Sequence, residues 1–381
     1  MGDYGKVVTG KTPPTKDIEN YENGTYLWAS PADLGTIKSI TETKTMLSAQ
    51  GFSKTRTLPK GSVLVTCIGS TIGKAGMSTK EMSTNQQINS IVVNDNNDNE
   101  FVYYAIQSSF PRYLSSIAVQ AVPIISKSAF ELLPNNRSCL QEQKKIGKFL
   151  SLLDERISTQ NKIIEKLQSL IKGLEDNLLD NPLWKKTYLR SFMQFFSTNS
   201  LSWEQLSYEE GEIRNLHYGL IHGFQTRGIN AASLPMIKNE AVPKQYTLCQ
   251  VGDVAFADAS EDTGEIAKSV EFVDTIEGDT ICGLHTIHSR DIKNRTVVGF
   301  KGFAFNSRYF HNQIKRLAQG TKVFSITSNN LSSCYVYLPD LETQKAIVKL
   351  LKAYEAQLLV SRKTLKQYEN QKQYLLRQMF I

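Results

Sequence analysis

Two stretches decide the fold: QEQKKIGKFLSLLDERISTQNKIIEKLQSLIKGLEDNLL, residues 141–179, and ETQKAIVKLLKAYEAQLLVSRKTLKQYENQKQYLLRQMF, residues 342–380. In each, apolar residues recur in alternating steps of four and three, the period of a heptad seam. The first seam consists of Ile146, Leu150, Leu153, Ile157, Ile164, Leu167, Ile171, Leu174 and Leu178. The second consists of Ile347, Leu351, Tyr354, Leu358, Leu365, Tyr368, Leu375 and Met379. The pattern predicts two long helices, each with one apolar stripe.

The two stretches repeat each other in register. Every position of the second seam lies 201 residues after a position of the first, and Gln143 and Gln344 match with the same offset. A helix of about 39 residues would span about 58 Å, which is long for one globular domain. We therefore expect the two helices to pack on each other. The second can cover the first only by running back along it, so the pair is expected to be antiparallel. The sequence leaves open whether the helices pair within one chain or between two.

The regions before the two helices are also comparable. Runs rich in β-branched residues predict strands at Ser62–Ile68 and Gln87–Val93, and again at Asp253–Phe256 and Thr280–Ser289. An aromatic-rich helical stretch follows in each region, at Phe101–Leu114 and Phe303–Leu317. The predicted fold class is α/β (α+β), with two globular domains separated by the helices and related by a pseudo-two-fold internal repeat. The predicted order is a first domain at 1–140, a long helix at 141–179, a linker at 180–200, a second domain at 201–340 and a long helix at 341–381.

Composition places few further limits on function. The net charge of +7 suits a polyanionic partner but does not require one. The five cysteines are scattered and form no CxxC pair, which favours a reducing compartment over a disulfide framework. The sequence has no apolar run of membrane-spanning length and no signal-like N-terminus. We therefore expect a cytoplasmic protein.

Several motifs taken in order resemble the specificity subunits of type I restriction-modification systems. They are the runs at Gln141–Ile146 and Leu341–Ile347, the ending Tyr374–Phe380, the opening Gly10–Pro13, the turn Gly69–Lys74, and Asn85-Gln86-Gln87. The second domain departs from the pattern. Glu265 stands where the turn of the first domain has its lysine, and Cys282-Gly283-Leu284-His285 replaces the Asn-Gln-Gln stretch.

The resemblance implies a DNA-reading subunit that is not itself an enzyme. Each globular domain would be a target-recognition domain for one half of a split, asymmetric double-stranded DNA sequence. The paired helices would set the spacing between the halves and dock two modification (methyltransferase) subunits, and two restriction/translocase subunits would complete the complex. This chain would hold no cofactor, whereas the partner subunits would use S-adenosylmethionine, ATP and Mg.

Polar and basic residues in turns, or beside the matched strands, are the predicted DNA contacts. Lysine and arginine bind phosphates, and asparagine, glutamine, arginine and histidine read base edges. The predicted contacts are Lys11, Lys74, Asn85, Gln86 and Gln87 in the first domain, and His222, Arg227, His285, Arg316 and Lys322 in the second. The alternative for each is an ordinary solvated side chain.

Signals for catalysis or metal binding are weak. The segment Asp180–Trp184 is similar to the NPP-aromatic motif of adenine methyltransferases, but Leu183 replaces one proline and no glycine-rich cofactor motif is evident. Cys282, His285 and His288 have metal-like spacing, but on a strand His285 would point away from the other two. We expect no catalytic residue and no metal site. The remaining alternatives are a fused methyltransferase-specificity protein, the recognition part of another methyltransferase or nuclease system, and a coiled-coil scaffold that does not read DNA.

Overall fold

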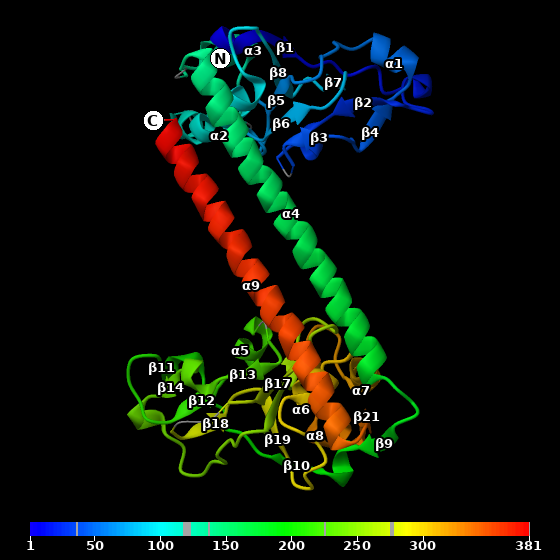
Figure 1. Ribbon diagram of the computed structural model, residues 1–381, viewed down its shortest axis with the longest axis vertical. Helices are drawn as coiled ribbons and strands as arrows, with labels where there is room; N and C mark the ends of the chain where they lie inside the picture. The colour runs from blue at the N-terminus through cyan, green and yellow to red at the C-terminus, as the bar shows by residue number, and fades with distance from the viewer. Residues whose placement is uncertain (36, 117–122, 136–137, 225, 275–277, 381) are drawn as a thin grey trace. The chain divides into compact units, whose positions relative to one another are not determined.

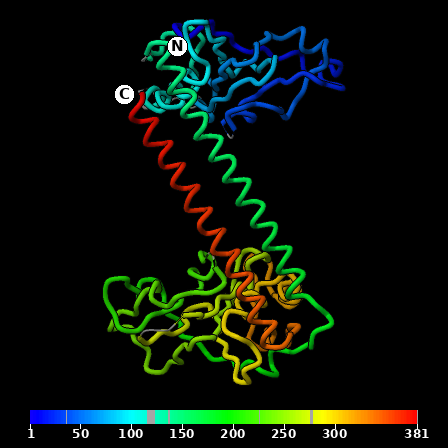
Figure 2. The backbone as a smooth tube through the Cα atoms, in the orientation of Figure 1, coloured from blue at the N-terminus to red at the C-terminus, as the bar shows by residue number. Residues whose placement is uncertain are grey.

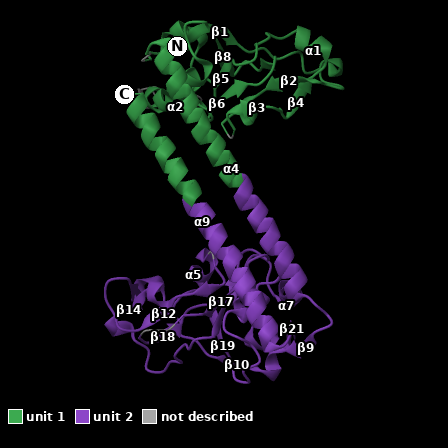
Figure 3. Ribbon diagram, viewed as in Figure 1, with its two compact units in different colours: residues 1–161, 364–381 green, residues 162–363 purple. Residues whose placement is uncertain are grey.

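The computed structural model describes residues 1–35, 37–116, 123–135, 138–224, 226–274 and 278–380. The chain divides into two compact units, residues 1–161 with 364–381 (unit 1) and residues 162–363 (unit 2) (Figure 3). The two long helices are α4 (Leu140–Leu179) and α9 (Leu341–Met379) (Figure 1). The division crosses both, so each unit contains a part of each helix (Figure 3). Both ends of the chain belong to unit 1 (Figure 2).

The long helices pack on each other within each unit. In unit 1, Leu150 of α4 shares a hydrophobic core with Leu376 of α9, and Lys372 Nζ lies 2.6 Å from Asp154 Oδ1. The beginning of α4 therefore lies against the end of α9.

The opposite ends of the same helices meet in unit 2. There Leu174 and Leu178 of α4 pack on the core that contains Ile347 and Leu351 of α9. Because the end of one helix always meets the beginning of the other, the pair is antiparallel. The prediction of two long antiparallel helices is confirmed, and both belong to one chain.

Unit 1 is built on a five-stranded sheet and a smaller three-stranded one. The order of the first sheet is β1 (Gly5–Thr9), β8 (Ile88–Val93), β5 (Val63–Thr66), β6 (Ala75–Ser78) and β3 (Ser39–Ile40). That of the second is β4 (Thr45–Leu47), β2 (Tyr26–Ala29) and β7 (Ser83–Thr84). The helices are α1 (Ala49–Ser53), α2 (Asn99–Ser116) and α3 (Lys127–Leu132), of which α2 and α3 pack on the larger sheet.

Unit 2 repeats this plan with four strands in its second sheet. The five-stranded sheet has the order β10 (Met193–Phe196), β19 (Thr286–Asp291), β15 (Val254–Ala257), β17 (Ser269–Phe272) and β13 (Gly228–Ile229). The second has the order β11 (Leu206–Ser207), β14 (Met236–Ile237), β12 (Arg214–Leu216) and β18 (Thr280–Cys282). The helices are α5 (Tyr218–Gly223), α6 (Phe300–Ala304), α7 (Arg308–Leu317) and α8 (Ser328–Ser333). Two strand pairs complete the unit, β16 (Ala259–Ser260) with β20 (Phe324–Ser325) and β9 (Lys185–Tyr188) with β21 (Tyr335–Leu338).

The two larger sheets correspond strand by strand. At one edge of each sheet an antiparallel pair forms, β1 with β8 in unit 1 and β10 with β19 in unit 2. At the other edge the outer strand is parallel to its neighbour, β3 to β6 and β13 to β17. The register also corresponds, because Leu64 faces Ser90 in unit 1 as Ala255 faces His288 in unit 2. The predicted internal repeat is confirmed at the level of sheet topology.

Three local predictions were wrong. Residues 180–200 are not simply a linker, because β9 and β10 lie there and β10 pairs with β19 along the sheet of unit 2. The stretch Thr280–Ser289 contains two strands, β18 and β19, separated by residues 283–285, where His285 has a φ of 52°. The stretch Phe303–Leu317 is divided between α6 and α7, because Ser307 caps a new helix by accepting the backbone N–H of Phe310.

A buried glutamine joins each sheet to its long helix. Gln143 Oε1 accepts the backbone N–H of Asp98 at 3.0 Å, and its Nε2 donates to Asn97 Oδ1 at 3.1 Å. Gln344 repeats the contact, accepting the backbone N–H of Val297 at 3.0 Å and donating to the Arg295 carbonyl at 3.0 Å. Both glutamines therefore hold the segment that follows the strand β8 or β19 against the first turn of a long helix.

We expect Gln143→Ala to lower the free energy of unfolding by about 2–3 kcal/mol, because it leaves buried polar groups at Asn97 and Asp98 without partners. Urea unfolding of the full chain measures the change. Gln141→Ala is the matched control, since Gln141 is exposed in the same helical turn. An equal loss of stability in both variants would contradict the role given to Gln143.

Two carboxylates, buried Glu175 and half-buried Glu355, meet Arg227 in unit 2. The backbone N–H of Arg227 donates to Glu355 Oε1 at 3.2 Å, and its Nε lies 4.0 Å from Glu175 Oε1. Burial raises the pKa of Glu175 to about 7, with Arg227 opposing the shift and Glu355 adding to it. Burial likewise raises the pKa of Glu355, against the effect of Arg227. In unit 2, one carboxylate from each long helix thus lies against Arg227, in surroundings that favour the protonated form of Glu175.

Since the pKa of Glu175 is higher in the folded state than its usual 4.5, folding favours the protonated form. Stability is then lost as pH rises from about 4.5 through about 7, by up to about 3 kcal/mol. We expect Glu175→Gln to remove most of this loss in urea unfolding at pH 5 and pH 8. Glu165→Gln, at an exposed position of the same helix, should leave the loss as it is in the unaltered chain. The same pH dependence in both variants would refute the assignment.

Candidate nucleic-acid interface

A glycine-rich turn in unit 1 presents an exposed lysine. The turn Gly69–Lys74 joins β5 to β6 and is closed by hydrogen bonds from Ile72 N to Gly69 O (3.2 Å) and from Lys74 N to Thr71 O (3.1 Å). Gly69 and Gly73 have φ angles of 94° and 89°, which an L side chain rarely adopts. The turn therefore needs its glycines for shape and leaves the Lys74 side chain in solvent.

A second turn, between β7 and β8, lies beside the first. The Gln87 carbonyl accepts Cys67 N at 2.7 Å, and the Thr84 carbonyl accepts Lys11 N at 2.8 Å. Gln86 Oε1 accepts the hydroxyl of Thr12. The structure thus brings together Lys11, Gln86 and Gln87 of the predicted contacts, and the Gln87 amide lies beside the turn that ends in Lys74.

Asn85 has a different role from the one predicted. It is only 7% exposed, its Oδ1 accepts the backbone N–H of Gln87 at 3.0 Å, and its Nδ2 donates to Gln87 Oε1 at 3.0 Å. Both polar ends of Asn85 are therefore engaged by Gln87. Asn85 positions its neighbour and is not itself presented to a ligand.

In unit 1, the turn after β5 and the turn before β8 are joined by a backbone hydrogen bond and form a frame. The same frame recurs in unit 2, where it contains a lysine that was not predicted from the sequence. The Lys268 carbonyl accepts Ala257 N at 2.9 Å, as the Lys74 carbonyl accepts Thr66 N at 2.9 Å. Ala267, with φ of 56°, takes the place of Gly73. Lys268 and not Glu265 is therefore the counterpart of Lys74. The alignment failed because the turn is longer in unit 2, although a lysine directly before a buried strand was a visible signal.

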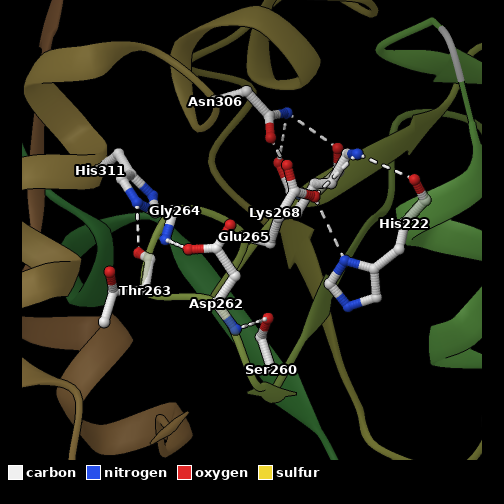
Figure 4. Close-up of polar contacts among 10 residues, drawn as sticks. His222, Ser260, Asp262, Thr263, Gly264, Glu265, Lys268, Asn306 and His311 are labelled. Carbon is white, nitrogen blue, oxygen red and sulfur yellow. Dashed lines mark hydrogen bonds and ion pairs between the residues drawn. The ribbon is translucent and has the colours of Figure 1, made fainter. Parts of the chain in front are cut away.

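Lys268 belongs to a polar group with His222 and Glu265 (Figure 4). Its Nζ donates to Glu265 Oε2 at 2.9 Å and to the His222 carbonyl at 3.0 Å, while His222 Nδ1 lies 3.3 Å from Glu265 Oε2. Burial alone would raise the pKa of Glu265, but the hydrogen bonds from Lys268 and His222 outweigh it and lower the pKa. The charged carboxylate therefore fixes both neighbours.

His285 takes the position of Gln87, since its carbonyl accepts Asp258 N at 3.0 Å. Its exposed ring lies with Nδ1 3.0 Å from Asp258 Oδ1. The ring of Tyr218 meets those of His222 and His285 edge to face, at centroid distances of 6.2 and 5.3 Å. The structure therefore gathers the predicted residues His222 and His285 around Tyr218, which the sequence analysis did not single out.

The other three predicted residues of unit 2 lie in different surroundings. Arg227 faces the carboxylates of the long helices, so its predicted role as a DNA contact is not supported by its position. Arg316 is exposed in the last turn of α7. Lys322 is exposed between Gln319 and Ser325, on a segment whose strand β20 pairs with β16 beside the long turn.

Comparisons with known proteins agree with the duplicated frame. Residues 1–169 and 283–370 match the family model of the type I restriction modification DNA specificity domain. The chain is 30% identical over 182 residues to the HindI specificity subunit of Haemophilus influenzae, a match covering 45% of this chain and 39% of that protein. It is 24% identical over 319 residues to the MjaVIII specificity subunit of Methanocaldococcus jannaschii, covering 79% and 72%.

Solved structures share the fold at low sequence identity. The S subunit of a type I restriction-modification system from M. genitalium superposes with a TM-score of 0.59 at 16% identity, covering 99% of this chain and 93% of that one. A chain from a study of the assembly and conformational transition of the type I R-M system gives a TM-score of 0.56 at 15% identity, covering 98% and 95%.

The family model covers more than half of the chain, and the fold agrees with it. The chain belongs to the family of type I restriction-modification DNA specificity domains. It matches only 39% of the length of the HindI subunit. None of the helices in the described part of the chain is both long and apolar enough to cross a membrane.

We expect Lys74→Ala to weaken binding of the full chain to double-stranded DNA and to lower the slope of log affinity against log salt by about one, the effect of losing one phosphate contact. Fluorescence anisotropy at several salt concentrations measures both. Lys60→Ala is the control, because Lys60 is exposed before β5, whereas the Gly69–Lys74 turn follows that strand. Equal effects of the two substitutions would show only a loss of general positive charge.

Proposed function

We propose that this chain is the DNA-reading specificity subunit of a type I restriction-modification complex, with each unit reading one half of a split, asymmetric target. The observation that carries the proposal is that the same hydrogen-bonded arrangement of two turns occurs in both units, with different side chains at equivalent positions. Gln87 of unit 1 corresponds to His285 of unit 2, and Gln86 corresponds to Leu284. Equal frames with unequal side chains suit two half-sites of different sequence.

The physical chemistry of the frame supports direct reading of bases. Glutamine and histidine side chains can read the edges of bases in the major groove, while Lys11, Lys74 and Lys322 can hold phosphates. Loops supported by sheets are suited to this task because the sheet fixes where each side chain points. Two weak readers in one chain also gain affinity, since the second contact becomes intramolecular, and the spacing between half-sites becomes part of the specificity.

The partners in this proposal are two modification subunits and two restriction/translocase subunits in the cytoplasm. The long helices carry exposed apolar side chains, including Phe149 and Leu152 on α4 and Leu350 and Val360 on α9, which suit protein contacts. This chain supplies no catalysis and no cofactor. It supplies register, while a modification subunit flips and methylates its adenine with S-adenosylmethionine, and a restriction subunit uses ATP and Mg.

The experiment maps methylated adenines in cells that contain the neighbouring modification subunit, with and without this gene. We expect a split asymmetric motif that disappears on deletion. Exchanging residues 1–140 for those of a relative should then change one half-site and leave the other half unchanged. An unchanged methylome in the presence of an active modification subunit would overturn the proposal and favour a scaffold that binds protein alone.

A further inference from the structure

Two cysteines and a histidine meet in the interior of unit 2. Cys249 Sγ lies 3.5 Å from Cys282 Sγ, and a ring nitrogen of His288 lies within 4.8 Å of both. The three side chains are 6%, 2% and 1% exposed. In the sequence, Cys282 lies close to His285 and His288, a set that on one strand does not predict a metal site. The fold turns His285 outward and brings in Cys249 from a distant segment.

His288 is oriented by a buried carboxylate. His288 Nε2 lies 2.7 Å from Asp253 Oδ2, and both side chains are buried. Asp253 accepts hydrogen bonds from Arg290 Nε (2.8 Å), Arg290 Nη2 (2.7 Å) and the backbone N–H of Gln250 (2.8 Å). A carboxylate that accepts one imidazole N–H fixes the tautomer and leaves the lone pair on the other nitrogen, Nδ1.

Unit 1 shows that the fold does not require these side chains. Leu58 N donates to Met82 O as Cys249 N donates to Thr280 O, so Leu58 corresponds to Cys249. By strand register, Thr84 corresponds to Cys282 and Ser90 to His288. All three residues of unit 1 are buried. The same backbone frame therefore forms in unit 1 with no cysteine or histidine at any of the three positions, whereas unit 2 has all three of these donors together.

We propose that Cys249, Cys282 and His288 bind one thiophilic metal ion, Zn(II), inside unit 2. Thiolate and imidazole donors select zinc over the hard cations Mg²⁺ and Ca²⁺. Tetrahedral zinc with Zn–S bonds of about 2.3 Å places two sulfurs about 3.8 Å apart, so the sulfur pair seen here needs little movement. One coordination position remains for a further ligand.

The position of Cys282 gives the ion a role. Cys282 ends β18 and directly precedes the turn that presents His285. A bound ion would tie this turn to Cys249 and to β19. An effect of the ion on DNA reading rests on the proposed function, whereas metal binding itself does not.

The test loads the full chain with Zn(II) under reducing conditions, removes excess metal on a desalting column, and measures bound zinc by mass spectrometry. We expect about one zinc per chain and a rise in melting temperature with zinc, because a ligand that binds the folded state stabilises it. The test variant combines Cys249→Leu with Cys282→Thr, the residues that unit 1 carries at these positions and buries without difficulty. We expect it to lose both effects.

Cys334→Ser is the matched control, since Cys334 is another buried thiol of unit 2 whose Sγ contacts the Asn330 carbonyl. It should keep the bound zinc and the thermal shift. Replacement of zinc by Co(II) provides a second readout, because thiolate ligation produces a sulfur-to-cobalt charge-transfer band. We expect this band in the unaltered chain and in Cys334→Ser, and not in the double variant. Absence of zinc from the unaltered chain, or retention of zinc in the double variant, would overturn the site. No DNA is present, so the result is independent of the proposed function.

Discussion

The start of each long helix depends on one buried amide. Gln143 and Gln344 each satisfy a backbone N–H of the segment that leaves the last long strand of a sheet, and each does so from the first turn of a helix. A buried N–H without an acceptor is costly, so the direction in which the helix leaves its sheet is tied to this contact. The rest of each unit follows from that connection, because helix α4 or α9 closes the hydrophobic core that its sheet begins.

Local periodicity was enough to predict the helices, and comparison of the halves was enough to predict the repeat. The seam from Ile146 to Leu178 follows a rule that operates over single turns of helix, so it is visible in sequence. The strand β10 was missed because it is defined by pairing with β19, nearly a hundred residues away in the chain. The break at residues 283–285 was missed although Gly283 lies in it, because the residue with the left-handed backbone is His285, and that backbone is uncommon for residues other than glycine.

The candidate site was predicted only in part, since residue type does not distinguish a ligand contact from an internal one. Arg227 and Lys38 both precede the parallel edge strand of a larger sheet. Lys38 Nζ donates to Glu100 Oε2 at 2.7 Å and to Ser151 Oγ at 2.8 Å, and Arg227 meets the carboxylates of Glu175 and Glu355. These basic residues hold sheet to helix. Lys268 was missed for the opposite reason, because a longer turn moved it out of alignment.

The division of the chain bears on the order in which it folds during synthesis. Unit 2 is one continuous segment, residues 162–363, and has all of its parts once that segment has left the ribosome. Unit 1 begins first but includes residues 364–381, and Leu376 belongs to its core. Its N-terminal part must therefore wait with an unfilled apolar surface while unit 2 is made. The usual sequence, in which the N-terminal domain is finished first, is reversed here, and the waiting segment is the one most exposed to chaperones and to aggregation.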